Sequence, residues 1–104
     1  MENPAEGSTA WPVLRNQLLD AFLTLKTREE VEAFLADLCT PAEIRAFVER
    51  WHVARLLDGE ELSYREIAEA AGASTTTVVR VARFLREMPY QGYRLAIDRS
   101  KGRT

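Results

Sequence analysis

"SYREIAEAAGASTTTVV", residues 63–79, is the stretch that decides the fold of this chain. It opens with a helix-start signature, in which the hydroxyl of Ser63 accepts from a backbone N–H and Glu66 reaches back to the cap. Gly72 follows where two helices joined by a tight turn must reverse direction. The stretch therefore predicts a helix-turn-helix over about residues 63–87.

The second helix of this unit has two different faces. At about 100° per residue, one face gathers the apolar residues Val78, Val81, Ala82 and Leu85, which we expect to pack on a core. Short side chains at the helix start would let the opposite face approach base edges, and arginines can reach guanine or phosphate. We expect contacts to double-stranded DNA from the cap, the outer face and its flanks: Ser74, Thr75, Thr76, Val79, Arg80, Arg83 and Arg86.

The residues before this unit also show helical periodicity. Apolar side chains at helical spacing predict helices over about residues 13–25, 31–38 and 44–57, and helix-start signatures stand at Thr27 and Thr40. No stretch alternates as a strand would, so the predicted fold class is all-α. We expect Gly59 to close the third helix in the left-handed conformation.

The chain is short enough for one domain, which we place at residues 1–104. Its ends, about 1–10 and 100–104, have the composition of flexible segments. The tail from residue 89 to 104 fits either a strand-like or a helical piece, and the sequence leaves this open.

Charge is distributed unevenly although the net charge is only −2. Residues 1–70 hold 14 acidic and 7 basic side chains, whereas residues 71–104 hold 2 acidic and 7 basic ones. The negative net charge argues against generic attraction to nucleic acid, whereas the basic C-terminal third allows a local binding patch.

Several functional classes are disfavoured. No apolar run reaches about 18 residues, which argues against a membrane span. The start also lacks the pattern of a signal peptide. We therefore expect a cytoplasmic protein, which is nucleoid-associated when bound to DNA. The single Cys39 and single His52 form no metal-ligand spacing, and we expect a buried or half-buried thiol and a solvated or helix-packed imidazole. We expect no metal, no cofactor and no enzymatic activity, because catalysis needs convergent titratable groups.

A family resemblance rests on several short motifs. They are "TPAE" (40–43), Arg50, "LLDGE" (56–60), "SYREIAEAAGAS" (63–74) and "TTVVR" (76–80). Over about residues 30–97 the chain resembles the Trp repressor superfamily, a helix-turn-helix group. The tail "GYRLAI" (92–97) makes it similar to the small Trp-repressor-related branch of the YerC/YecD type.

The resemblance implies an all-helical, intertwined homodimer whose subunits exchange their first three helices. Each side would carry one helix-turn-helix, so the operator would be roughly palindromic, with half-sites about one helical turn apart. Arg65 matches a position of the family that contacts DNA, and Thr75, Thr76 and Val79 match positions that meet the major groove.

The resemblance also points to an effector pocket, and here the sequence departs from the family. Arg50 and Arg80 occupy the positions of two arginines that flank the tryptophan ligand. Val81 and Phe84 stand where the family has a glycine and a serine, and the larger side chains should fill the space of an indole. We therefore expect no control by tryptophan, and whether another small molecule replaces it stays open.

These observations predict a sequence-specific transcription regulator, a repressor that acts as a homodimer on a palindromic operator. The alternative is a helical protein-interaction module with vestigial DNA binding. The acidic net charge and the pair Glu66 and Glu69 on the first motif helix favour that alternative slightly.

Overall fold

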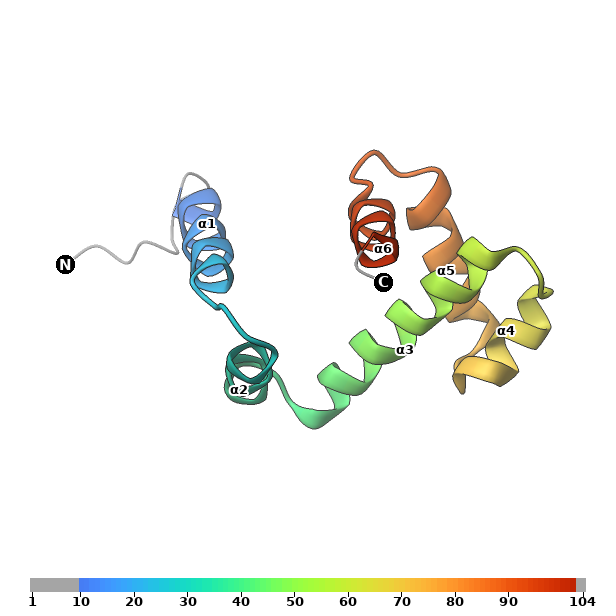
Figure 1. Ribbon diagram of the computed structural model, residues 1–104, viewed down its shortest axis with the longest axis horizontal. Helices are drawn as coiled ribbons and strands as arrows, with labels where there is room; N and C mark the ends of the chain where they lie inside the picture. The colour runs from blue at the N-terminus through green and yellow to red at the C-terminus, as the bar shows by residue number, and fades with distance from the viewer. Residues whose placement is uncertain (1–9, 103–104) are drawn as a thin grey trace. The chain divides into compact units, whose positions relative to one another are not determined.

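The computed structural model describes residues 10–102, and within this range the chain contains six α-helices and no β-strand. The helices are α1 (Ala10–Leu23), α2 (Arg28–Leu38), α3 (Pro41–Gly59), α4 (Tyr64–Ala71), α5 (Thr75–Arg86) and α6 (Gly92–Lys101) (Figure 1). The all-α prediction is confirmed. Of the predicted flexible ends at about 1–10 and 100–104, residues 1–9 and 103–104 lie outside the described residues.

Helices α1 and α2 form one compact unit, which ends at Thr40. Phe22 of α1 meets Phe34 of α2 edge to face, with ring centroids 5.0 Å apart. Thr27 caps α2 as predicted, because its hydroxyl accepts from the backbone N–H of Glu30 at 3.1 Å. Neither helix contains a buried residue, so the unit has no interior of its own.

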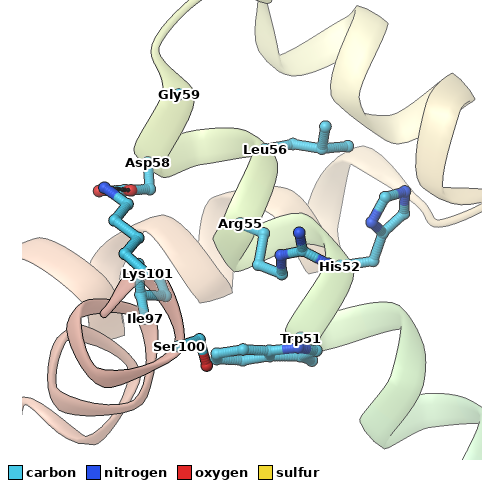
Figure 2. Close-up of a pocket in the computed structure, with 9 residues that line it drawn as sticks. All are labelled: Trp51, His52, Arg55, Leu56, Asp58, Gly59, Ile97, Ser100 and Lys101. Atoms are coloured by element: carbon cyan, nitrogen blue, oxygen red, sulfur yellow. Dashed lines mark ion pairs between the residues drawn. The ribbon is translucent and has the colours of Figure 1, made fainter. Parts of the chain in front are cut away.

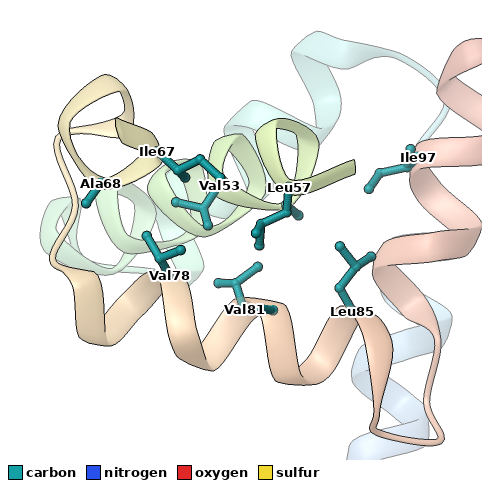
Figure 3. Packing of buried hydrophobic residues seen from close by; sticks show 10 residues of the cluster. Val53, Leu57, Ile67, Ala68, Val78, Val81, Leu85 and Ile97 are labelled. Carbon is teal, nitrogen blue, oxygen red and sulfur yellow. The ribbon is translucent and has the colours of Figure 1, made fainter. Parts of the chain in front are cut away.

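Helices α3 to α6 form the second unit, from Pro41 onward, and this unit has a core. Side chains from all four helices meet in it (Figure 3). The predicted inner face of α5 is confirmed, because all four of its apolar residues are buried. The core consists of Val53, Ala54, Leu57, Ile67, Ala68, Val78, Val81, Ala82, Leu85 and Ile97.

The end of α3 differs from the prediction in one detail. Gly59 is the last helical residue and does not have a positive φ, whereas Glu60 adopts the left-handed conformation with φ of 58°. The backbone N–H of Glu60 still bonds to the carbonyl of Leu57 at 3.2 Å. The chain therefore reverses one residue later than the glycine position indicated.

The tail forms a helix, which settles the alternative that the sequence left open. Helix α6 runs to Lys101 and so continues into the end segment that we expected to begin at residue 100. Asp58 at the end of α3 bonds to Arg94 at 2.7 Å and to Lys101 at 2.6 Å. The hydrogen bond from Lys101, and then that from Arg94, lowers the pKa of the Asp58 carboxyl. These ion pairs connect α6 to the end of α3.

Candidate nucleic-acid interface

Helix α4 is fixed at both ends by local hydrogen bonds. At its start the Ser63 hydroxyl accepts from the Glu66 N–H at 3.2 Å, and the Glu66 carboxylate accepts from the Ser63 N–H at 2.9 Å. That second bond lowers the pKa of the Glu66 carboxyl. At its end Gly72 has φ of 66°, and the Ala73 N–H reaches back to the Ala68 carbonyl at 3.0 Å. This closure turns the chain directly into α5.

The start of α5 leaves two backbone donors free. The hydroxyl of Ser74, a predicted DNA contact, accepts from the N–H of Thr77 at 3.1 Å and so caps the helix. The backbone N–H groups of Thr75 and Thr76 have no acceptor among residues 10–102. They lie at the positive end of the helix dipole, where an anion is stabilised.

The outer face of α5 is exposed along its length. Val79 shows this most clearly, because its side chain is 55% exposed although the neighbouring Val78 is fully buried. A single exposed valine is ordinary. Here it belongs to a continuous exposed surface, which we call the α5 outer face and which consists of Thr75, Thr76, Val79, Arg80 and Arg83.

The predicted arginines fall into three environments. Within residues 10–102 the guanidinium groups of Arg65 and Arg83 are exposed and have no hydrogen-bond or ion-pair partner. The guanidinium of Arg80 lies 4.4 Å from the centre of the Phe84 ring. That of Arg86 donates to the Tyr64 hydroxyl at 3.1 Å and, more weakly, to the carbonyl at the end of α3 at 3.5 Å. Arg86 is therefore partly committed to holding the helices together.

The four predicted effector-pocket residues have different surroundings. Val81 is 1% exposed and belongs to the core, while Arg50 is half-buried on α3. Phe84 is half-buried and lines a cavity of about 320 Å³ with residues 90–93. Neither Arg50 nor Arg80 lines that cavity.

A larger cavity of about 630 Å³ lies between α3 and α6 (Figure 2). None of its lining residues belongs to α4 or α5, so it is separate from the α5 outer face. Its rim carries the Asp58–Lys101 ion pair. It is lined by Trp51, His52, Arg55, Leu56, Asp58, Gly59, Ile97, Ser100 and Lys101.

The single cysteine and the single histidine belong to different compact units. Cys39 is a half-buried thiol, and His52 is exposed. In the described part of the chain no three His, Cys, Asp or Glu side chains gather as they would around a metal ion. Over the same residues, no helix combines the length and the apolar character needed to cross a membrane.

Three features of the site were missed from the sequence. Tyr64 accepts a hydrogen bond from Arg86, 22 residues away. Tyr90 stacks on Phe84, with ring centroids 6.3 Å apart. Asp58 pairs with α6 across more than 30 residues. Helical spacing within "GYRLAI" could have indicated α6, but the partners of Tyr64 and Asp58 lie more than 20 residues away and have no local signal.

Comparisons with known proteins agree on one group. The family model described as Trp repressor protein matches residues 14–101. The chain is 42% identical over 86 residues to the uncharacterised protein YerC of Bacillus subtilis (strain 168), covering 83% of this chain and 81% of that one. It is 36% identical over 75 residues to a Trp operon repressor homolog of Chlamydia trachomatis serovar D, covering 68% and 80%.

Two solved structures match along most of their length. A candidate Trp repressor from Staphylococcus aureus has a TM-score of 0.79 and 37% identity, covering 86% of this chain and 87% of that chain. A TrpR-like protein from Eubacterium eligens ATCC 27750 has a TM-score of 0.77 and 35% identity, covering 96% of each. Both similarities extend over the two units of the chain.

Proposed function

This chain belongs to the Trp repressor family, and from that premise we propose that it is a sequence-specific DNA-binding transcription regulator. It acts as a repressor, as a homodimer on a palindromic operator, without control by tryptophan. The observation that carries the proposal is the α5 outer face, where an exposed valine and unpaired arginines stand on a helix whose other side is buried.

The α5 outer face offers each kind of contact that DNA recognition needs. The free N–H groups of Thr75 and Thr76 suit a phosphate oxygen. Val79 can touch a thymine methyl, and Arg83 can bind guanine or phosphate. Arg65 adds a second unpaired charge from α4. The remaining predicted contacts are Ser74, Arg80 and Arg86. Each makes a hydrogen bond or a ring contact within the chain and is also exposed, so it can still reach DNA.

Exposed apolar side chains support the homodimer. Neither α1 nor α2 buries a residue, and the first half of α3 leaves Phe47 and Val48 exposed. A second copy would cover this surface, as in the exchange of the first three helices that the family resemblance implies. The exposed apolar residues of α1 and α2 are Trp11, Val13, Leu18, Leu19, Leu23, Val31 and Leu38.

Independence from tryptophan rests on Val81 and Phe84. Val81 is packed in the core, so its methyl groups cannot move aside without opening a space there. The Phe84 ring is held in place by its contacts with Arg80 and Tyr90. Isothermal titration that detects saturable tryptophan binding below millimolar concentration would contradict this part of the proposal.

Selection of bound duplexes from a random pool, followed by fluorescence anisotropy on the selected operator, tests the DNA-binding function. We expect Arg83→Ala to weaken binding by roughly tenfold, because a lost arginine–base contact costs about 1–3 kcal/mol. Arg99→Ala removes the same charge from exposed α6 and serves as the matched control, with affinity unchanged within about twofold. Equal affinities of Arg83→Ala and the wild type would show that the recognition surface is assigned wrongly.

The alternative function has a distinct outcome in the same assay. Non-specific affinity for DNA is mostly electrostatic, so a DNA-binding protein should bind random duplex at about 50 mM salt. Complete absence of binding there would favour a protein-interaction module. A regulator of this kind works in the cytoplasm, on the nucleoid, and needs no enzymatic activity.

A further inference from the structure

A short stack of side chains runs from the α5 outer face to the turn before α6. The Arg80 guanidinium lies over the Phe84 ring at 4.4 Å, one helical turn further along α5. On Phe84 stacks Tyr90, with ring centroids 6.3 Å apart and planes inclined by 14°. Phe84 therefore contacts both of the other residues, and we call these three side chains the Arg80 stack.

The turn that carries Tyr90 is fixed by its own hydrogen bonds. The Met88 N–H donates to the Arg83 carbonyl at 3.1 Å, and the Gln91 amide donates to the Met88 carbonyl at 2.7 Å. Gln91 itself has a left-handed backbone with φ of 57°, a conformation that non-glycine residues adopt uncommonly. Tyr90 is nevertheless 73% exposed, so core packing does not explain its position.

Arg80 has no other partner in the described part of the chain. Helix α5 itself has no acidic residue, and Glu87, which caps its C-terminal end, forms no ion pair with Arg80. An arginine on a helix surface has many rotamers, and a binding partner must select one of them at a cost in free energy. A ring beneath the guanidinium reduces that freedom before the partner arrives.

We propose that Phe84 and Tyr90 are positioning residues for DNA binding, which hold the Arg80 guanidinium on the α5 outer face before DNA is bound. This inference rests on the proposed DNA-binding function and adds two residues that do not themselves contact DNA. Phe84 acts directly through its ring, and Tyr90 acts through Phe84. The hydroxyl of Tyr90 has no part in the stack, so phenylalanine should replace tyrosine there without loss.

A double-mutant cycle on the selected operator tests the proposal. We expect Arg80→Ala to weaken binding by about tenfold and to reduce the slope of log affinity against log salt by about 1. Phe84→Leu, which keeps an apolar side chain of similar size, should weaken binding by about two- to fivefold, the range of an exposed cation–π contact. It should leave the salt slope unchanged, because the charge is still present. In the Arg80→Ala background, Phe84→Leu should have no further effect.

The Tyr90 variants and a measurement without DNA complete the test. Tyr90→Ala should weaken binding by about twofold, and Tyr90→Phe should bind as the wild type does. In the free protein, the side-chain NMR resonances of Arg80 should show an upfield shift from the Phe84 ring, lost in Phe84→Leu. Circular dichroism confirms that each variant keeps its helices.

The outcomes separate the two proposals. If Phe84→Leu binds as the wild type does, or loses the same factor in the Arg80→Ala background, the stack does not position Arg80 and this inference is overturned. A wild type that binds no duplex overturns the proposed function and the inference together. If Arg80→Ala weakens binding and Phe84→Leu does not, only the inference fails.

Discussion

The two compact units of this chain use similar residues with different results. Leu23 of α1 is 82% exposed, whereas Leu57 of α3 is 2% exposed. Full burial of a leucine side chain stabilises a protein by about 1.5–3 kcal/mol, so Leu57 contributes to stability in a way that Leu23 does not. In the first unit, the rings of Phe22 and Phe34 contact each other between α1 and α2. Amphipathic helices are thus specified in both units, but only residues 41–102 find a core within their own chain.

The largest expected effect comes from opening the core of the second unit. Leu57→Ala should lower the free energy of unfolding by about 2–5 kcal/mol, because it removes apolar contacts and leaves a cavity. Urea unfolding followed by the fluorescence of Trp51, which packs against the core, measures it. Leu95→Ala on the exposed side of α6 is the matched control, with a loss of about 0.5 kcal/mol or less. Equal losses for the two variants would contradict the core assignment.

A second prediction tests whether a second copy of the chain covers the exposed leucines of the first unit. If a second copy covers α1, the double variant Leu19→Ser, Leu23→Ser should weaken dimer formation at least tenfold, because each leucine contributes apolar burial in both copies. Sedimentation velocity over a range of protein concentrations measures the change. The wild type should sediment as a dimer at concentrations where the variant is a monomer.

Two results would contradict that prediction. A wild type that stays monomeric at every concentration would mean that the exposed leucines serve another purpose. A double variant with the dimerisation of the wild type would place the interface elsewhere. Arg28→Ser, a polar substitution on exposed α2, controls for unrelated effects of surface changes.

Most of the fold could be predicted from the sequence because it depends on local patterns. Helical periodicity and the Ser63–Glu66 signature give the helices and the closely spaced pair α4 and α5. Gly72 adopts the positive φ expected for a tight turn. The position of the left-handed residue after α3 was predicted one residue early, because a glycine permits this conformation but does not require it.

The candidate site was less predictable, because it depends on distant partners. Exposure of Thr76 and Val79 follows from the helical wheel alone. The hydrogen bond from Arg86 to Tyr64 depends on how α4 and α5 meet. The contact of Arg80 with Phe84 joins residues four apart on α5, so helical spacing could have indicated it. The burial of Val81 in the core and the contact of Phe84 with Tyr90 likewise depend on packing beyond α5 itself.

A third prediction concerns the ion pairs that join α3 to α6 within the second unit. The pKa of Asp58 is lowered in the folded protein, so its contribution to stability is present above the ordinary pKa near 4 and is lost as the pH falls through the lowered value. Asp58→Asn should cost about 0.5–1 kcal/mol at pH 7, a modest loss because Arg94 and Lys101 are partly exposed. The loss should shrink at pH 3. Asp98→Asn removes the weaker 3.3 Å pair and is the control, with a smaller loss; a pH-independent effect of Asp58→Asn would contradict the ion-pair assignment.

Effects of similar, small size are expected at two left-handed positions of the second unit, where the backbone alone decides the outcome. A Cβ at Gly72 would meet no atom within 4 Å, so Gly72→Ala should cost only the conformational penalty of a positive φ, about 1 kcal/mol. Glu60 already has this conformation, so Glu60→Gly should leave stability unchanged or raise it by up to about 1 kcal/mol. Thermal unfolding of both variants beside the wild type gives the two signs. A loss at both positions would mean that the side chain of Glu60 stabilises its turn by more than its backbone conformation costs, and the rigidity of the second unit would then depend on side-chain contacts in its turns as well as on its core.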